Sequence, residues 1–291
     1  MNQHATPSKK HWLLFASWIV AGLLLFWNPF AALFHLAWTD ATASHILLIP
    51  FICAWLIYLD HKQLPSPASF DISGALLFLI PSAFLAAFTW HANSLPLDIK
   101  STAFILALVL FFVAGFIGIF GKRAARLEWF PLAFLLFLVP FPNFLLDRVV
   151  YFLQAGSADI AEYFFDLSGV PVLREGFFFR LPKFSIEVAQ ECSGIRSSIA
   201  LLILALLVAH FAFRPFWKKA LFVFAGLLMM LLKNGIRIAV LTILANYVNP
   251  DFLLGRLHHQ GGIVFFLVGL ALLFPVYWLL KRGEPAPSPT A

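Results

Sequence analysis

Charged side chains are scarce in this chain: Asp, Glu, Lys and Arg make up only 12% of its 291 residues, whereas 62% are hydrophobic. A soluble domain of this length carries about twice that charged fraction. The deficit excludes an ordinary soluble fold. An aromatic share of 17%, which includes 35 Phe, fits a surface in contact with lipid. The sequence therefore predicts an all-α polytopic membrane protein.

Cysteine is rarer still, since Cys53 and Cys192 are the two in the chain. Two cysteines do not make a disulfide framework, and a bridge between them is possible but not indicated. Cys53 lies inside an apolar run, where we expect it to serve packing. Cys192 lies among polar residues at the mouth of another apolar run, so packing and chemistry are both open interpretations for it.

Apolar runs long enough to cross a bilayer as helices recur along the chain. The fifth run ends in Val139-Pro140-Phe141-Pro142, which is expected to break its helix. The seventh run is long and is interrupted by Lys233-Asn234-Gly235-Ile236-Arg237. We predict about eight spans, at about 12–30, 46–59, 72–90, 101–120, 128–146, 193–213, 219–246 and 260–280.

These spans organise the chain into one expected integral-membrane domain over residues 1–283. The first run lacks a small-residue cleavage site and is interpreted as a retained span. Residues 284–291 are rich in proline and are expected to form a disordered tail. Residues 147–191 are mixed in character and are predicted to form a small extracytoplasmic cap between spans five and six.

Within the predicted cap, residues 147–167 show the pattern of an amphipathic helix lying on the membrane surface, with Val150, Leu153, Ile160 and Phe164 among polar residues. Ser168-Gly169-Val170-Pro171 is a turn signal. Two short strands are expected after it, at 177–179 and 184–188.

The net charge of +6 does not indicate nucleic acid, because the basic residues stand in short clusters between the apolar runs. Such clusters set the orientation of a membrane protein, and the positive-inside rule places both termini in the cytoplasm. The protein is expected to lie in the cytoplasmic (inner) membrane. With this topology, Cys192, Arg237 and His258 share the extracytoplasmic face. The sequence thus predicts that a thiol, a guanidinium and an imidazole meet at one depth.

These three residue types suit nucleophilic catalysis. Cys192 precedes a helical run whose N-terminus favours an anion, and thiolate is the nucleophilic form of cysteine. Ser193 or Glu191 is a candidate N-cap of that helix. His258 is a candidate base, and Arg237 is a candidate for stabilising an oxyanion or holding a carboxylate.

The neighbouring polar residues have two interpretations each. Asn234 shares a helix face with Arg237 and is a candidate to orient it, whereas Lys233 is interpreted as an anchor that reaches the membrane surface. Arg196 is either a second cation of the site or an outward-facing residue of a first helical turn. His258 and His259 are either functional or surface histidines. With Cys192 they offer no tight metal-ligand spacing, so neither a metal nor a cofactor is expected.

Three motifs together resemble the signature of the exosortase/archaeosortase family, on its exosortase branch. They are Glu191-Cys192-Ser193-Gly194-Ile195-Arg196-Ser197, Asn234-Gly235-Ile236-Arg237-Ile238, and His258 followed by Gly262 and Phe265-Phe266. The early Ser44-His45-Ile46-Leu47-Leu48-Ile49-Pro50 resembles the second span of that family. The resemblance covers residues from about 44 to 280, and the three motifs are specific only in combination.

The resemblance implies a multi-pass cysteine transpeptidase or protease that acts on exported, membrane-anchored proteins in the lipid bilayer. Such substrates carry a C-terminal sorting segment, made of a Pro-Glu-Pro-type motif, a transmembrane helix and a basic cluster. The resemblance assigns Cys192 as the nucleophile, Arg237 as the transition-state or substrate-orienting cation, and His258 as the acid and base. His259 is the less favoured alternative, because Gly262 keeps the family's four-residue step from His258.

Two other function classes stay open on the sequence. A transporter or exporter subunit for cell-surface polysaccharide would use Arg237, Lys233 and Arg196 as an anion path. A membrane scaffold would need none of these groups. The sequence favours the enzyme, since the charged intramembrane residues gather near one face and do not mark a path across.

Overall fold

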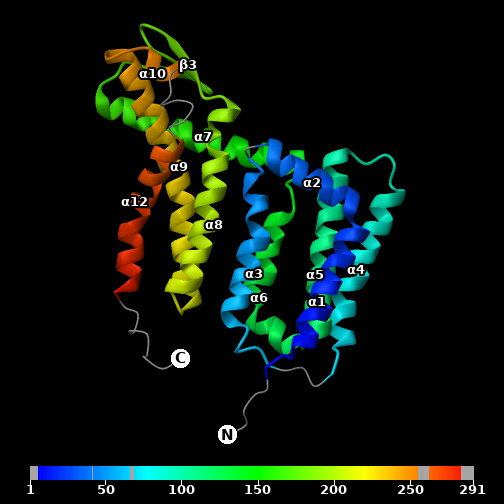
Figure 1. The fold of residues 1–291 in the computed structure, drawn as a ribbon. Helices are drawn as coiled ribbons and strands as arrows, with labels where there is room; N and C mark the ends of the chain where they lie inside the picture. The colour runs from blue at the N-terminus through cyan, green and yellow to red at the C-terminus, as the bar shows by residue number, and fades with distance from the viewer. Residues whose placement is uncertain (1–5, 41, 66–68, 255–261, 283–291) are drawn as a thin grey trace. The chain divides into compact units, whose positions relative to one another are not determined.

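The computed structural model describes residues 6–40, 42–65, 69–254 and 262–282. The tail predicted at 284–291 lies outside these residues, as do the side chains of Glu191 and Cys192. The chain forms two compact units, Met1–Leu145 and Leu146–Ala291. Helices dominate both units (Figure 1), which confirms the predicted all-α class.

The first unit is built around α5 (Leu97–Leu127), which packs against α1, α2, α4, α6 and η2. This helix is largely buried because apolar residues occupy all its faces, whereas a helix at the edge of a bundle is apolar on one face only. The other elements are α1 (Lys9–Leu25), α2 (Trp27–Thr39), η1 (Ser44–Leu47), α3 (Ile49–Asp60), α4 (Ile72–His91), α6 (Trp129–Phe134) and η2 (Leu135–Leu138).

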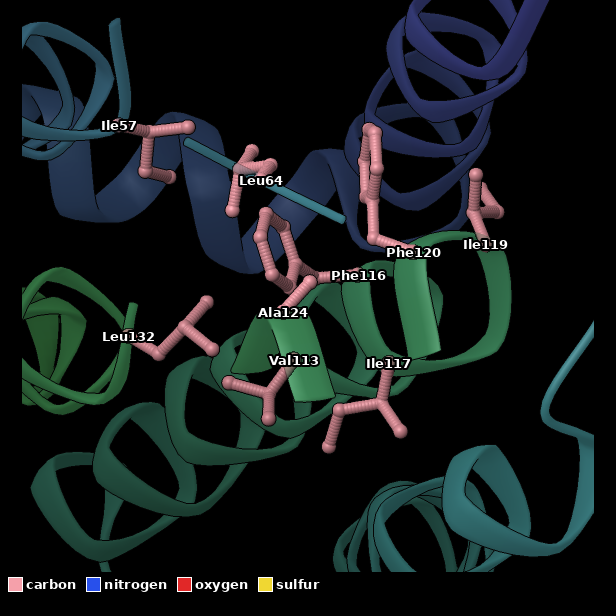
Figure 2. Packing of buried hydrophobic residues seen from close by; sticks show 9 residues of the cluster. All are labelled: Ile57, Leu64, Val113, Phe116, Ile117, Ile119, Phe120, Ala124 and Leu132. Atoms are coloured by element: carbon pink, nitrogen blue, oxygen red, sulfur yellow. The ribbon is translucent and has the colours of Figure 1, made fainter. Parts of the chain in front are cut away.

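One end of α5 holds the apolar core of the first unit. Phe116 and Phe120 are almost fully buried there, and Phe116 points toward Leu64 (Figure 2). Trp12 and Phe15 of α1 pack against this cluster from outside, with ring centroids of Trp12 and Phe120 4.8 Å apart. Aromatic packing thus fixes α1 along α5. Cys53 of α3 is a buried free thiol in the same unit, as its apolar run predicts.

Trp18 joins α1 to α5. Its ring stacks on Phe111 at 4.4 Å between centroids, and its Nε1 donates a hydrogen bond of 2.9 Å to the Phe111 carbonyl oxygen. A Cβ placed on Gly115 would lie 2.1 Å from the Trp18 ring. The helices approach this closely because Gly115 has no side chain.

Near its end, α5 is broken at Gly121, whose φ of 85° is left-handed and favours glycine. Asp71 caps α4 at this point, because its carboxylate accepts hydrogen bonds from the backbone N–H groups of Gly74 (2.8 Å) and Lys122 (3.3 Å). The bond from Gly74 contributes most to holding the pKa of the Asp71 carboxyl below its ordinary value, and the Lys122 ammonium at 3.4 Å adds to it. Asp71 therefore ties the start of α4 to the kink of α5.

The second unit combines three long helices with a small sheet. Its helices α8 (Ile195–Ala212), α9 (Phe216–Tyr247) and α12 (Gly262–Lys281) lie side by side (Figure 1). Most of α7 (Asn143–Ser168) also belongs to this unit, as does the short α10 (Asp251–Leu254). The strands β1 (Leu173–Glu175), β2 (Phe178–Arg180) and β3 (Ser185–Glu187) pair antiparallel in the order β1-β2-β3, and η3 (Gln190–Ser193) follows them.

The described residues do not confirm the expected count of eight membrane spans. Within the described residues, five helices are long and apolar enough to cross a membrane, namely α4, α5, α8, α9 and α12. Two bent pairs raise the number to seven if each is one span: α1 with α2, at 86°, and Trp129–Leu138 with α7, at 97°. The apolar run at 46–59 forms part of the shorter helix Ser44–Asp60. The count of eight is therefore not confirmed, because hydropathy does not register bends. The bend before α7 does follow Pro140 and Pro142, where a break was predicted.

The segment predicted as a cap contains one strand more than expected. The predicted strands at 177–179 and 184–188 correspond to β2 and β3, and β1 precedes them. Phe179 of β2 is fully buried against Phe165 of α7, with ring centroids 5.2 Å apart. Ile238 and Ala239 of α9 belong to the same buried cluster, so the sheet rests on α7 and α9 together.

The four residues predicted on the apolar face of α7 differ in their burial. Of the four residues expected on it, Leu153 alone is fully buried, while Gln154, Ser157 and Ala158 are buried in place of the others. Ile160 packs closely on α9 because Gly235 has no side chain: a Cβ on Gly235 would lie 2.3 Å from the Ile160 side chain. The α7 backbone is also close at this point, because the Ser157 carbonyl oxygen would lie 3.1 Å from that Cβ.

Arg174 of β1 connects the sheet to α7. Its Nη1 lies 2.8 Å from the Asp159 carboxylate and 2.7 Å from the Glu162 carboxylate, and its side chain is one-fifth exposed. A second pair, Arg180 with Glu175 at 2.7 Å, lies within the sheet and is more than half exposed at the arginine. Exposed pairs contribute little to stability, so the Arg174 bridge is the one expected to matter.

We expect the substitution Gly115→Ala to lower the free energy of unfolding of the protein by about 1–3 kcal/mol, because the added methyl group overpacks the Trp18 contact. Thermal unfolding in detergent micelles measures this. Gly118→Ala is the control on the same helix, since its nearest neighbour would be the Ala75 Cβ at 3.2 Å. In the Trp18→Ala background the Gly115→Ala effect should shrink, because the clash is gone; additive effects would contradict this contact.

We expect Arg174→Ala to loosen the sheet and Arg180→Ala to leave it intact. Hydrogen exchange of the β1 and β2 amides in the full chain measures the difference, with faster exchange in the Arg174 variant. Removing Arg174 breaks a bridge between two elements, whereas removing Arg180 breaks an exposed pair within one sheet. Equal exchange in both variants would show that the bridge to α7 does not hold the sheet.

Candidate functional site

The segment that carries Cys192 passes from β3 through η3 into α8. The turn is made by Gly194, whose φ of 72° is left-handed, and α8 begins at Ile195. A Cβ on Gly194 would also lie 2.7 Å from the Oδ1 atom of Asn234. Glycine is therefore required at this position both for its backbone conformation and for the close approach of α9.

The predicted capping of α8 by Ser193 or Glu191 is wrong. Gly194 is the N-cap residue, and glycine has no side chain that could cap the helix. Ser193 is fully buried, and its Oγ makes no hydrogen bond to any residue that the structure describes. The left-handed turn is the reason, because it moves the start of the helix from residue 193, where the span was predicted to begin, to Ile195. Cys192 consequently precedes the first residue of α8 by three positions.

The polar stretch from Lys233 to Arg237 lies inside one unbroken helix, α9. The predicted interruption is therefore one of composition and not of structure. Asn234 is 1% exposed, and its Nδ2 donates a 3.0 Å hydrogen bond to the Ser157 hydroxyl of α7. Since its Oδ1 faces Gly194, Asn234 joins α7, α9 and the turn before α8. Its expected role in orienting Arg237 stays a prediction.

Lys233 is buried and does not reach the membrane surface as an anchor. It is 1% exposed, and its Nζ donates a 2.5 Å hydrogen bond to the Ser197 hydroxyl of α8. Ser197 in turn donates a 3.0 Å hydrogen bond to the Gly194 carbonyl oxygen. A Cβ on Gly269 of α12 would lie 3.3 Å from the Lys233 Cδ, so α12 covers the lysine stem. This chain of contacts leads from a buried cation to the turn that follows Cys192.

The other candidate residues differ in how the structure places them. Arg237 lies one turn after Lys233 on α9 and is half-buried, whereas Arg196 in the first turn of α8 is exposed, as its outward-facing interpretation predicts. His258 and His259 lie outside the described residues. The predicted meeting of Cys192, Arg237 and His258 therefore stays a prediction.

Two side chains of α7 belong to this site and were not expected from the sequence. Ser157 accepts the hydrogen bond of Asn234, and Gln154 donates through its Nε2 to the Val188 carbonyl oxygen, just before η3. Both are buried. A signal for them exists, because Gln154, Ser157, Ala158 and Ala161 recur at the spacing of one helix face. Because these side chains are small or polar, the sequence pattern predicts that this face lies on the surface.

A comparison with models of protein families agrees with this arrangement of motifs. The model described as transmembrane exosortase matches residues 37–275, which is most of the chain and includes all three motifs. No curated protein and no solved structure matches the chain. Because the match spans both compact units, it covers the fold as a whole. The chain belongs to the transmembrane exosortase family.

Proposed function

We propose that the protein is a membrane-embedded cysteine protease or transpeptidase that removes a C-terminal sorting segment from exported proteins. Membership of the exosortase family supports a membrane transpeptidase in general. The observation that carries the proposal further is the contact of Asn234 and of the Lys233–Ser197 pair with Gly194, two residues after Cys192. Buried polar groups that converge on a backbone turn next to a thiol are expected of a reactive segment, not of packing.

In the proposed reaction the Cys192 thiolate attacks the scissile carbonyl carbon, and the Arg237 guanidinium stabilises the oxyanion. The C–N bond then breaks, and His258 gives a proton to the leaving amine, which departs with the substrate's helix. An acyl-thioester remains on Cys192. An acceptor amine or water attacks it, loses a proton to His258 and restores the thiolate.

The bilayer contributes to this reaction by holding the substrate. The proposed substrate segment has a Pro-Glu-Pro-type motif, a transmembrane helix and a basic tail, so its helix is already oriented in the membrane before it binds. Pre-orientation removes much of the entropy cost of bringing the peptide to the thiol. In this proposal the site faces the extracytoplasmic side of the inner membrane, with both termini in the cytoplasm.

Lys233 serves in this proposal as a positioning residue. A buried ammonium needs hydrogen-bond acceptors, and Ser197 provides one that also holds Gly194. The positive charge, together with the N-terminus of α8, favours an anion in the preceding segment. Lys233 would thus fix the turn and favour the thiolate of Cys192 without contacting the substrate.

We expect Cys192→Ala and Cys192→Ser to abolish processing of a co-expressed substrate while the protein stays in the membrane. The physical reason is that alanine has no nucleophile and that serine is a far weaker one without a matched base. Mass spectrometry of the substrate measures removal of its tail, and an acyl adduct on Cys192 would be detected in the wild type. Cys53→Ala, at the buried thiol of α3, is the control that should keep activity. Normal processing by Cys192→Ala would remove the nucleophile assignment.

We expect Lys233→Met to shift the pH dependence of Cys192 alkylation upward by about one pH unit, because a nearby positive charge favours the thiolate. Iodoacetamide labelling in a Cys53→Ala background measures this, since Cys192 is then the single thiol. Processing should fall with the thiolate population. Ser197→Ala keeps the charge of Lys233, so it should slow processing but shift the pH dependence of Cys192 alkylation less than Lys233→Met does.

Lys218→Met is the matched control for Lys233→Met. Lys218 is another buried lysine of α9, and its Nζ donates a 2.9 Å hydrogen bond to the Leu280 carbonyl oxygen of α12. It lies four turns before Lys233, so its removal should leave the alkylation profile unchanged. An equal shift in both variants, or none in Lys233→Met, would reduce Lys233 to a structural role.

A further inference from the structure

A pocket of about 450 Å³ opens in the second unit between the start of β3 and the C-terminal end of α9. Lys183, Phe184 and Ser185 line it on the side of the sheet, and Asn246 and Tyr247 line it on the side of the helix. None of the residues above has been assigned to catalysis. Within the part of the chain that the structure describes, the lining contains no acidic side chain.

Two polar groups of the pocket are prepared for a ligand. The Lys183 Nζ donates a 2.7 Å hydrogen bond to the Asn246 carbonyl oxygen, which fixes the ammonium at the end of α9. An ammonium has three N–H donors, so this bond leaves two of them for a ligand. The Asn246 side chain is 7% exposed, and its Oδ1 accepts no hydrogen bond from the described residues.

These groups define the chemistry of the ligand. The ammonium favours a carboxylate, and a buried amide oxygen without a donor favours an incoming N–H group, because leaving it unsatisfied is unfavourable. The Phe184 and Tyr247 side chains add an apolar wall beside them. A peptide that carries an acidic side chain offers the carboxylate, the N–H and the apolar surface together.

We propose that this pocket binds an acidic side chain of an extended peptide, and that it is a specificity subsite for the substrate. The inference rests on the proposed function, since it takes the peptide to be the segment next to the scissile bond. Strand β3 supports this placement, because the chain runs from Ser185 through β3 directly into the segment with Cys192.

Helix geometry gives the distance between this pocket and the proposed site of reaction. Asn246 follows Arg237 by nine positions on α9, which is about 13 Å along the axis at 1.5 Å per residue. An extended peptide covers that distance in about four residues at about 3.3 Å each. We therefore expect the acidic residue of a substrate to lie about four residues from its scissile bond.

Binding is tested on the full chain in micelles with the Cys192→Ala substitution, so that no cleavage occurs. The probes are a rhodamine-labelled, end-blocked octapeptide with one central glutamate, and its glutamine counterpart. Fluorescence anisotropy should show about tenfold tighter binding of the glutamate peptide, which is the range of one charge-assisted hydrogen bond. Equal binding of the two peptides to this unaltered pocket would overturn the proposal.

Variants assign the preference to the pocket. Lys183→Met should weaken binding of the glutamate peptide about tenfold and leave binding of the glutamine peptide unchanged. Lys183→Arg should restore the preference for glutamate. Arg180→Ala is the matched control, because Arg180 is a cation of the same sheet that pairs with Glu175 and does not line the pocket. If Arg180→Ala lowers the preference as much as Lys183→Met, the effect is general electrostatics and the proposal fails.

A uronic-acid oligosaccharide is the competitor that tests the other ligand class, since it also combines carboxylates with hydrogen-bond donors. Displacement of the peptide by lower concentrations of this sugar than of unlabelled peptide would overturn the assignment to a peptide. The outcome is separate from the proposed catalysis. Selective peptide binding without processing by the Cys192 protein would contradict the reaction alone, and processing without glutamate preference would contradict the pocket alone.

Discussion

The second unit depends on the burial of one ammonium group. Lys233 carries its charge into an apolar helix bundle, where an unpaired ion would destabilise the fold by several kcal/mol. Its partner is the Ser197 hydroxyl, and the Gly194 carbonyl oxygen completes the chain of hydrogen bonds. The requirement to satisfy this cation therefore fixes α8 against α9 at the point where the Cys192 segment enters the helix.

The same region is shaped by close approach of backbones. Gly194 admits Asn234, Gly235 admits Ile160 of α7, and Gly269 of α12 admits the stem of Lys233. Each glycine removes a side chain where two elements meet, so helices from four parts of the sequence converge on a small polar cluster. Packing of this kind resists shifts of even one methylene, which suits a site whose groups must hold a fixed geometry.

The first unit is held together by apolar packing, which the sequence predicted more fully. Aromatic and aliphatic residues of α5 pack against α1 and α4, as the long apolar runs indicate. Even there, the apolar run at 12–30 did not predict the 86° bend between α1 and α2, nor did the run of α5 predict the kink at Gly121. A hydropathy pattern counts apolar residues and does not register a change of helix direction, so the described residues show five to seven candidate spans where eight were expected.

Composition predicts the membrane class, the missing N–H of proline predicts the break at Pro140 and Pro142, and the order of the motifs along the chain predicts the family. The burial of Lys233, Ser157 and Gln154 could be seen only in the packed fold. Composition assigns such polar residues to the surface. Their burial depends on partners far along the chain, which supply the hydrogen bonds that water would otherwise provide.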